Sequence, residues 1–375
     1  MSTSFYQIIF ASFILCLTGC RQSSSPADSD ITVDANATYE TKALFHNLRA
    51  NTSKGILFGQ QDATAYGVGW KDEDLKSDVN EVCGSFPAVY GWDVSGIGGE
   101  YNIDSVRFDR MKFWIKSAFE RGGINTVSWH LQNPVTDGSC WDTTTAVRHI
   151  LPGGKFHNKY NRQLDLLADF FSQLKSKNGK LIPVIFRPFH EANGHWFWWG
   201  ARSCTDDKYI QLFRYTVSYL RDVKGVHNLL YAYSPDIFKT KENYLKRFPG
   251  EEYVDVLGVD NYYNFRSEDI VSEGIAQLRI VVELAKSMNK ISALTETGLD
   301  AQTDSTWWTK NLLYPIINDS VARNIAWILV WRNADAKHFF VPYPGQTAVQ
   351  DFIKFENHPF TVFERDLPKM YQFEK

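Results

Sequence analysis

The chain of 375 residues is 44% hydrophobic and 22% charged, a composition that is typical of a globular protein with a large buried core. Its net charge of -3 gives no reason to expect a nucleic acid or an acidic membrane surface as a partner. Aromatic residues make up 15%, and this density suits stacking against flat apolar faces such as those of sugar rings.

The first residues are predicted to be a targeting segment. Residues 8–15 form an apolar run that is too short to span a bilayer comfortably and is typical of a signal peptide. The run leads to Leu17-Thr-Gly-Cys20, which resembles the lipobox of bacterial lipoproteins, although residues 2–7 lack the usual Lys or Arg. We expect a lipoprotein signal peptide at 1–19, lipidation of Cys20, a flexible tether at 20–37 and one domain at 38–375. The alternative is a plain secretory peptide in which Cys20 has no role.

Three cysteines lie beyond this segment, namely Cys83, Cys140 and Cys204. Export would permit a disulfide. Cys140 and Cys204 both fall in predicted loops, so we expect these two to pair. No Cys-x-x-Cys or His-rich spacing indicates a metal site.

Short apolar runs alternate with helical patterns along the rest of the chain. Runs rich in β-branched and aromatic residues are typical of buried strands. The predicted strands are 56–58, 87–90, 125–129, 181–186, 229–233, 254–259, 291–294 and 325–331, and the clearest helices are 39–49, 105–121, 160–177, 206–223, 269–288 and 306–317. Eight strands with intervening helices predict a single parallel (β/α)8 barrel, the TIM barrel.

Each predicted strand ends in polar or aromatic residues that a barrel core would not accommodate. These endings are Gln60-Gln-Asp62, Trp92-Asp93, Trp129-His130, Arg187 to Glu191, Pro235-Asp236, Asp260-Asn-Tyr262, Thr295-Glu296-Thr-Gly298 and Trp331-Arg332-Asn333. The carboxyl ends of barrel strands meet at one mouth, where the active site lies. For Asp62, Asp93 and Asp236 we expect only a structural role as N-caps of the following helices. We interpret Asp260 as a supporting acceptor behind the reacting groups.

Two glutamates stand out among these endings. Glu191 follows the fourth predicted strand and Glu296 follows the seventh, so the two would face each other across part of the mouth. Two carboxyls on either side of a bound sugar are what glycosidic hydrolysis requires. In a purely structural interpretation, Glu191 pairs with Arg187 in an aromatic-capped loop. This interpretation does not account for Glu296.

A zinc site is excluded by spacing. A zinc-protease helix places two histidines four residues apart on one face. His190 and His195 are five apart, with Gly194 between them and Pro188 before them. We therefore expect neither a metal nor another cofactor.

The two glutamates, together with His190 directly before Glu191 and the stretch Gly194-His-Trp-Phe-Trp-Trp-Gly200, resemble glycoside hydrolase family 26, the β-mannanases of the retaining clan A. The resemblance continues through Trp129-His130, Asp260-Asn-Tyr262, Thr295 to Gly298 and Trp331-Arg332-Asn333, and so covers nearly the whole chain after the tether. It implies cleavage of β-1,4-mannosidic linkages in mannan, galactomannan or manno-oligosaccharides.

The resemblance also implies a role for each matching residue. Glu191 matches the general acid/base and Glu296 the nucleophile. The substrate-binding residues would be His130, His190, Trp196, Tyr262, Trp331 and Arg332. Among these, Tyr262 would orient the nucleophile and Trp331 would form the floor under the sugar to be cleaved. Arg187 would pair with a glutamate and tune its pKa, with Asp260 in support, whereas Trp198 and Trp199 could be core.

Other functions stay open at this point. A β-1,3-xylanase or a mixed-linkage glucanase would carry the same reaction centre. A glycan-binding lipoprotein without activity would use the tryptophans equally well but does not need the glutamate pair. The long segment 131–158 could wall off one end of a cleft and favour short products such as mannobiose.

The predicted location follows from Cys20. A lipid at this residue would anchor a monomeric barrel to the outer membrane without spanning it. The residues after Cys20 contain no acidic cluster, so we favour the periplasmic side over the cell surface.

Overall fold

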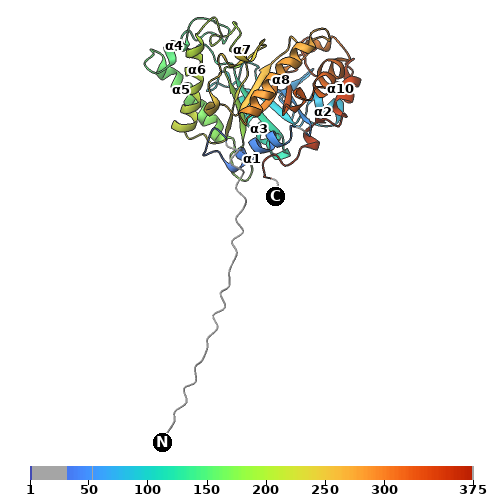
Figure 1. Cartoon of the computed structure of the whole chain (residues 1–375), viewed down its shortest axis with the longest axis horizontal. Helices are drawn as coiled ribbons and strands as arrows, with labels where there is room; N and C mark the ends of the chain where they lie inside the picture. The colour runs from blue at the N-terminus through green and yellow to red at the C-terminus, as the bar shows by residue number, and fades with distance from the viewer. Residues whose placement is uncertain (2–31, 53, 374–375) are drawn as a thin grey trace.

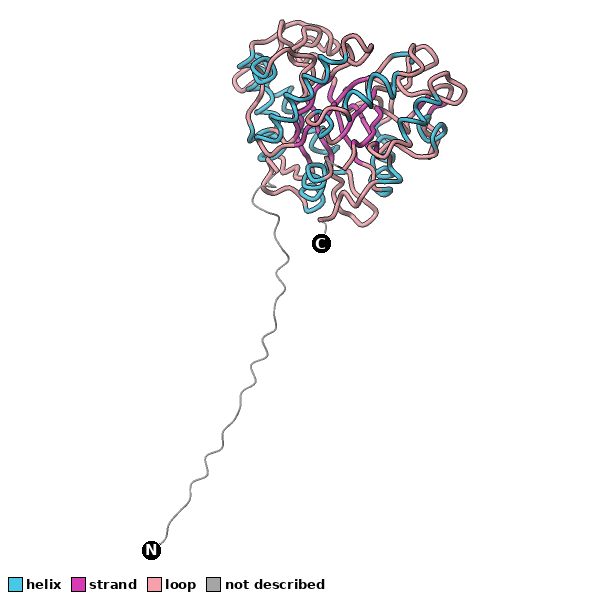
Figure 2. The backbone as a smooth tube through the Cα atoms, turned by 45° about the vertical axis from the view of Figure 1, so that its right-hand side comes forward, coloured by secondary structure: helices cyan, strands magenta, loops and turns pink. Residues whose placement is uncertain are grey.

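The computed structural model describes residue 1 and residues 32–52 and 54–373 (Figure 1). Within these residues, eight parallel strands close into a barrel, because β10 pairs with β1 as well as with β9. The barrel strands are β1 (Ile56–Gln61), β4 (Val89–Asp93), β5 (Ile124–Trp129), β6 (Val184–Pro188), β7 (Leu229–Tyr233), β8 (Val256–Asp260), β9 (Ile291–Thr297) and β10 (Trp327–Val330). Figure 2 shows the strands at the centre with helices around them. The predicted (β/α)8 barrel is confirmed.

The helices lie outside the barrel, and all six predicted ones are present with small shifts at their ends. They are α1 (Tyr39–Ala50), α2 (Asp78–Cys83), α3 (Phe108–Arg121), α4 (Val147–Ile150), α5 (His157–Gln173), α6 (Asp206–Ser218), α7 (Lys241–Leu245), α8 (Val271–Ser287), α9 (Tyr314–Ile317) and α10 (Val349–Glu356). A π-helical turn, Tyr219–Val223, extends α6, and another, Trp308–Leu313, precedes α9. Short elements complete the fold: the β2–β3 hairpin (Tyr66–Gly67 and Trp70–Lys71), β11 (Thr361–Val362) and 3-10 turns at 251–253, 300–302, 322–324 and 364–366.

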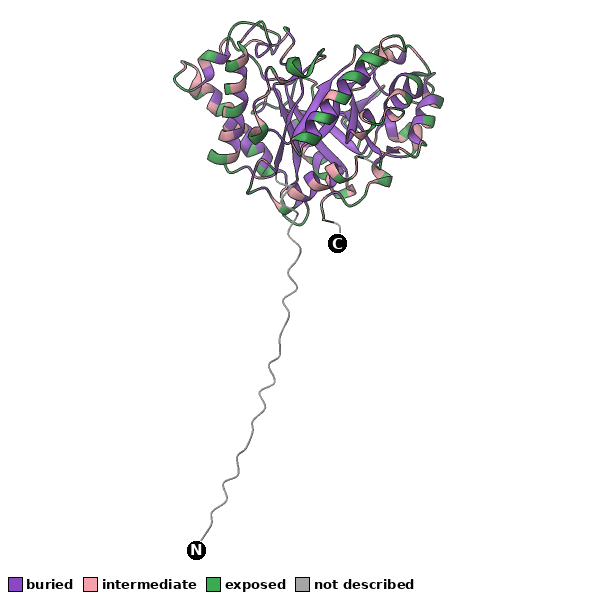
Figure 3. Ribbon diagram, in the orientation of Figure 1, coloured by how far each residue is buried: buried purple, intermediate pink, exposed green. Residues whose placement is uncertain are grey.

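The barrel strands are buried along their whole length (Figure 3), as expected for a parallel sheet that is covered on both faces. Inward-facing residues such as Leu57, Ile185 and Leu230 form one core cluster with Leu44 and Phe45 of α1. Because α1 contributes to this interior cluster, it closes the amino end of the barrel. The carboxyl end is left to the loops.

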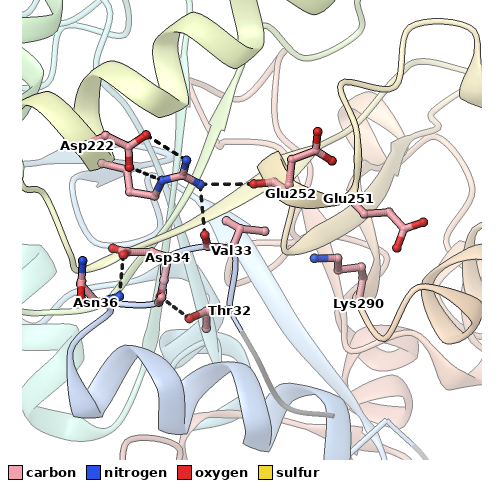
Figure 4. A pocket seen from close by; sticks show the side chains of 10 residues that line it. Thr32, Val33, Asp34, Asn36, Asp222, Glu251, Glu252 and Lys290 are labelled. Carbon is pink, nitrogen blue, oxygen red and sulfur yellow. Dashed lines mark hydrogen bonds and ion pairs between the residues drawn. The ribbon is translucent and has the colours of Figure 1, made fainter. Parts of the chain in front are cut away.

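Part of the predicted tether belongs to the folded domain. Thr32 and Asp34 are each 2% exposed. The backbone N–H of Val33 donates to Asp255 at 2.8 Å, and Asp34 pairs with His227 Nδ1 at 2.8 Å. Residues 32–37 are therefore fixed at the amino end of the barrel, where residues 32–36 help to line an open pocket of about 570 Å³ (Figure 4). The signal peptide, Cys20 and the rest of the tether lie outside the described residues.

The predicted disulfide is wrong, because Cys140 and Cys204 are both free. The two residues contact different members of one tryptophan pair. The carbonyl oxygen of Cys140 accepts from the backbone N–H of Trp198 at 3.2 Å, while the Cys204 thiol donates to the carbonyl oxygen of Trp199 at 3.2 Å. Trp198 and Trp199 are fully buried and belong to the core.

No helix in the described part of the chain is long and apolar enough to cross a membrane.

Candidate active site

The mouth of the barrel brings three carboxyl groups together. Glu191 follows β6, Asp260 ends β8 and Glu296 lies near the end of β9. One oxygen atom from each of the three lies within 4.8 Å of the others. Retaining glycosidases hold their two carboxyl groups about 5–5.5 Å apart and inverting ones about 6.5–9.5 Å. The Glu191–Glu296 separation therefore suits a retaining reaction.

A β-bulge places Glu296 in the mouth. Val259 of β8 pairs with Leu294, but the next residue, Asp260, pairs with Glu296, so β9 carries one extra residue here. The register between β9 and β10 shifts at the same point. A bulge turns a strand and re-aims its side chains. The predicted seventh strand stopped at residue 294 because the polar sequence after it gives no sign that pairing continues to Thr297.

Two donors hold the Glu296 carboxylate. The Tyr262 hydroxyl donates to Oε2 at 2.9 Å, and the Arg187 guanidinium donates to Oε1. Burial, followed by the charge of Glu296, raises the pKa of Tyr262 well above its ordinary value, so the phenol keeps its proton and stays a donor. Donors of this kind stabilise a buried carboxylate.

Arg187 is the positive centre of the site and is almost fully buried. Besides Glu296, it donates to Asp260 Oδ2 at 2.7 Å and to the Ser234 hydroxyl at 3.0 Å. The prediction that Arg187 pairs with a glutamate is confirmed, and that glutamate is Glu296 rather than Glu191. The three carboxyl groups are close enough to suggest a cation site, but Arg187 already acts as the counter-charge of two of them.

Glu191 lies in a different environment from Glu296. Burial, followed by the negative charges of Glu296, Asp260 and Asp236, raises its pKa well above the ordinary value. Among the described residues, its only direct donor is the Trp196 indole N–H, which contacts Oε2 at 2.7 Å. A carboxyl group with a raised pKa stays protonated near neutral pH and can act as an acid.

The backbone at Glu191 is held in an unusual conformation. Phe189 and Glu191 have φ angles of 54° and 52°, in the left-handed region that non-glycine residues seldom adopt. The Glu191 N–H donates to the carbonyl oxygen of Ser234 at 2.8 Å. The Asn193 side chain adds three bonds to the segment after β7: Nδ2 donates to the carbonyl oxygens of Asp236 and Ile237, both at 2.9 Å, and Oδ1 accepts from Asp236 N–H at 2.7 Å. Sequence reasoning did not identify Asn193.

Aromatic side chains surround the carboxyl groups. The rings of His130 and His190 meet edge to face with their centroids 4.5 Å apart, and Trp331 lies 6.1 Å from His130. Burial, followed by the charges of Arg187 and His130, lowers the pKa of His190 well below its ordinary value, so this ring is neutral. Its Nδ1 is buried and has no hydrogen-bond partner among the described residues.

Arg332 extends the site beyond Trp331. Its Nε forms an ion pair with Asp104 Oδ1 at 2.9 Å, and Nη1 lies 3.4 Å from the Tyr66 hydroxyl, which in turn donates to Asp62 at 2.7 Å. Burial and the neighbouring charge of Asp104 raise the pKa of Asp62 well above its ordinary value. Asp104 and Tyr66 could not be identified from the sequence, because they lie outside the endings of the predicted barrel strands, Tyr66 in the β2–β3 hairpin and Asp104 in a loop.

The N-cap interpretation of three aspartates is wrong. Helices α2, α3 and α7 begin after Ser77, Arg107 and Thr240 instead. Asp62 contacts Tyr66, Asp93 contacts His130 and Asp236 lies near Glu191. Long βα connections separate these strand ends from the helices that follow, which leaves the carboxyl groups in the mouth.

The chain is similar to known proteins along most of its length. The profile of glycosyl hydrolase family 26 matches residues 33–347. A mannan endo-1,4-beta-mannosidase of Bifidobacterium adolescentis is 37% identical over 89% of this chain, which spans only 35% of that relative's length. One from Bacillus subtilis is 29% identical, with 80% of this chain and 82% of that protein covered.

Among solved structures, a GH26 beta-mannanase from Bacteroides ovatus superposes with a TM-score of 0.86 and 43% identity, covering 90% of this chain and 98% of the other. With the barrel, the glutamate pair and the His190-Glu191 sequence in place, these similarities show that the chain belongs to glycosyl hydrolase family 26.

Proposed function

We propose that this protein is a retaining glycoside hydrolase that cleaves β-1,4-mannosidic linkages in mannan, galactomannan or manno-oligosaccharides. The observation that carries the proposal is the pair Glu191 and Glu296. One oxygen of each lies within 4.8 Å of the other, yet their environments differ. Arg187 and Tyr262 donate hydrogen bonds to Glu296, while burial and neighbouring charges raise the pKa of Glu191.

The first step is displacement of the leaving sugar. Glu296 attacks the anomeric carbon, and Glu191 gives its proton to the glycosidic oxygen as the bond to the anomeric carbon breaks. The products are a covalent glycosyl–Glu296 intermediate and a free sugar with a new hydroxyl group. Glu191 is left as a carboxylate.

The second step releases the other sugar. Glu191 takes a proton from a water molecule whose oxygen attacks the anomeric carbon, and the bond to Glu296 breaks. Both carboxyl groups return to their starting protonation states. The two inversions at the anomeric carbon give net retention of its configuration. The neighbouring carboxylate charge that raises the pKa of Glu191 is lost while Glu296 is esterified, which favours its change from acid to base.

The remaining predicted residues would bind the sugars. Trp331 supplies an apolar face for the sugar to be cleaved, and the His130 ring lies beside it with the His190 ring at its edge. Trp196 both orients Glu191 and borders the cleft. Arg332, fixed by Asp104, would contact the next sugar.

The substrate class rests on the relatives, whose names specify mannan. The test is a reducing-sugar assay on mannan, β-1,3-xylan and mixed-linkage glucan. We expect activity on mannan alone, and near-complete loss in Glu191→Ala and Glu296→Ala. Equal activity on another glycan would reassign the substrate, and close to wild-type activity of Glu296→Ala would disprove the nucleophile assignment.

The segment between β5 and α5 supports a preference for short products. It carries α4 and the exposed Trp141, whose ring lies 6.1 Å from that of His130. A wall at this position would limit how much chain extends past the cleft and would favour mannobiose. A time course on mannohexaose distinguishes the two modes: an early ladder of sizes means endo action, and mannobiose alone means end-directed action.

We also propose that the mature protein is a lipoprotein joined through Cys20 to the periplasmic side of the outer membrane. Residues 32–37 lie at the amino end of the barrel, opposite the mouth, so an anchor there would leave the cleft facing away from the membrane. Radioactive palmitate should label the wild-type protein but not Cys20→Ala. Accessibility to an added protease in intact cells would indicate the surface instead.

A further inference from the structure

Asp93 and His130 form a buried pair that the two displacement steps leave unexplained. Asp93 is 0% exposed and lies at the end of β4, beside the end of β5. Its Oδ2 accepts from His130 Nδ1 at 2.8 Å, from the Ser128 hydroxyl at 2.8 Å and from the His130 backbone N–H at 3.1 Å. Its Oδ1 accepts from the Ser95 backbone N–H at 2.8 Å. Four donors around one carboxyl group favour its ionised form.

The bond to Asp93 fixes which atom of His130 faces the cleft. Since Nδ1 contacts the buried carboxylate, the opposite ring edge with Nε2 points away from it. Nε2 has no hydrogen-bond partner among the described residues. The ring lies 4.5 Å from His190 and 6.1 Å from Trp331, both of which would contact the sugar. Nε2 is therefore the polar atom that His130 can offer to a substrate.

The charges around His130 favour its cation. Burial alone would lower its pKa, but the charge of Asp93 and the hydrogen bond to it, together with Glu296 and Asp104, raise the pKa above its ordinary value. His190, the other titratable neighbour, is neutral and adds no repulsion. A cation donates a stronger hydrogen bond to a hydroxyl oxygen than a neutral ring does.

We propose that Asp93 is a positioning residue that keeps His130 as an imidazolium whose Nε2–H donates a hydrogen bond to a hydroxyl of the sugar in the cleft. The inference rests on the proposed function for the identity of the ligand, but the state of the Asp93–His130 pair does not depend on it. In the competing arrangement, a neutral ring uses Nδ1–H for Asp93, and Nε2 accepts from the sugar.

The first measurement is a titration of His130 in the wild-type protein without substrate. Histidine labelled with 15N reports the protonation of each ring by NMR, and comparison with His130→Gln assigns the signal. We expect His130 to titrate above about 6.5, the ordinary value, and to titrate below it in Asp93→Asn. A wild-type ring that titrates at or below the ordinary value overturns the proposal, even if the protein hydrolyses mannan. Failure to hydrolyse mannan would overturn the proposed function and leave this titration interpretable.

The second measurement is kinetic. For Asp93→Asn on mannohexaose at pH 7, we expect KM to rise about tenfold or more, as for loss of a hydrogen bond to a charged group, with a smaller change in kcat. The rise should shrink at pH 5, where the ring regains its proton. A structural defect would not be repaired by acid. His130→Gln should show a KM rise that does not depend on pH, and the double variant should be no worse than His130→Gln.

Asp109→Asn is the matched control, because Asp109 is exposed on α3 and its change alters the net charge equally. It should keep the wild-type KM at both pH values. A wild-type KM in folded Asp93→Asn overturns the proposal. If Asp93→Asn does not fold, Ser128→Ala removes one donor from Asp93 Oδ2 and should shift the His130 titration in a measurable way. An unchanged His130 titration and an unchanged KM in that variant would contradict the proposed role of Asp93.

Discussion

Trp196 donates its indole N–H to Oε2 of Glu191 at 2.7 Å, and among the described residues it is the one side chain that donates a hydrogen bond to this carboxyl group. Two opposing influences therefore set the pKa of Glu191. Burial and three neighbouring carboxyl groups raise it, while the Trp196 bond lowers it because the bond stabilises the ionised form. Changing each influence should shift the pH profile in opposite directions.

Trp196→Phe removes the donor and keeps an aromatic ring. The pKa of Glu191 should rise, by about one unit if most of a charge-assisted bond is lost. The alkaline limb of kcat/KM reports the acid of the free enzyme, so this limb should move to higher pH while kcat falls, because Glu191 is less well oriented. A limb that moves to lower pH would contradict the assignment of Trp196 as the donor that favours the carboxylate.

Asp236→Asn should act in the other direction. Asp236 follows β7, and its negative charge is one of those that raise the pKa of Glu191. The amide keeps the shape and loses the charge. The backbone contacts of residue 236 with Asn193 involve no side-chain atom of Asp236 and should survive. The alkaline limb should move to lower pH, and the rate near neutral pH should drop as Glu191 ionises. An unchanged limb would show that this charge does not reach Glu191.

The same substitution should change the dependence of stability on pH. Burial raises the pKa of Asp236 to about 6, above its value of about 3.9 in an unfolded chain. The folded state therefore binds a proton more tightly, and the stability linked to Asp236 is full below about pH 4 and is lost as pH rises through about 6. Asp236→Asn should raise Tm relative to the wild type at pH 8 and have little effect at pH 4. The reverse order would contradict the raised pKa.

The sequence predicted the features of this site that depend on local pattern. Apolar runs located the eight strands, and their polar endings located Glu191, Glu296 and the aromatic residues around them. Features that depend on contacts between distant segments could not be predicted. The bulge at Glu296 depends on the register of β9 with its two neighbouring strands. Which of the two glutamates pairs with Arg187 depends on the geometry of the mouth.

Asp93 illustrates the same limit. An aspartate after a strand is often a helix cap, so its contact with His130 could not be inferred from the sequence. The contact arises because β4 and β5 are neighbours whose register brings Asp93 beside Ser128. The disulfide prediction failed for a related reason, since loop position alone does not bring two cysteines together.

Arg187→Met should destabilise the fold as well as abolish activity. The substitution leaves Asp260 and Glu296 buried without their counter-charge. Breaking one side of a buried ion pair typically costs about 3–5 kcal/mol, so Tm should fall by many degrees. Arg107→Met is the control, because Arg107 pairs with Asp109 at the exposed surface and such pairs contribute about 0–1 kcal/mol. Equal losses in the two variants would contradict the structural role of Arg187.

Asn193→Ala should impair proton donation by Glu191 and leave the attack by Glu296 largely intact. The side chain makes three hydrogen bonds that tie the Glu191 turn, with its left-handed backbone, to the segment after β7. Without them Glu191 should be misplaced relative to the glycosidic oxygen, while Glu296 keeps both of its donors. Misplacement of a catalytic group by about 1 Å can cost about a hundredfold in rate.

The leaving group separates this effect from general damage. Mannan needs its leaving oxygen protonated, and general acid catalysis contributes about 10²–10⁴-fold to such a step. A dinitrophenyl mannobioside releases dinitrophenolate, which leaves without a proton. Its first-turnover burst should therefore stay within a fewfold of the wild-type rate in Asn193→Ala, while kcat/KM on mannan falls about tenfold or more. Asn357→Ala, at the exposed end of α10, should change neither rate. An equal loss on both substrates would mean that Asn193 supports the whole site rather than the position of Glu191.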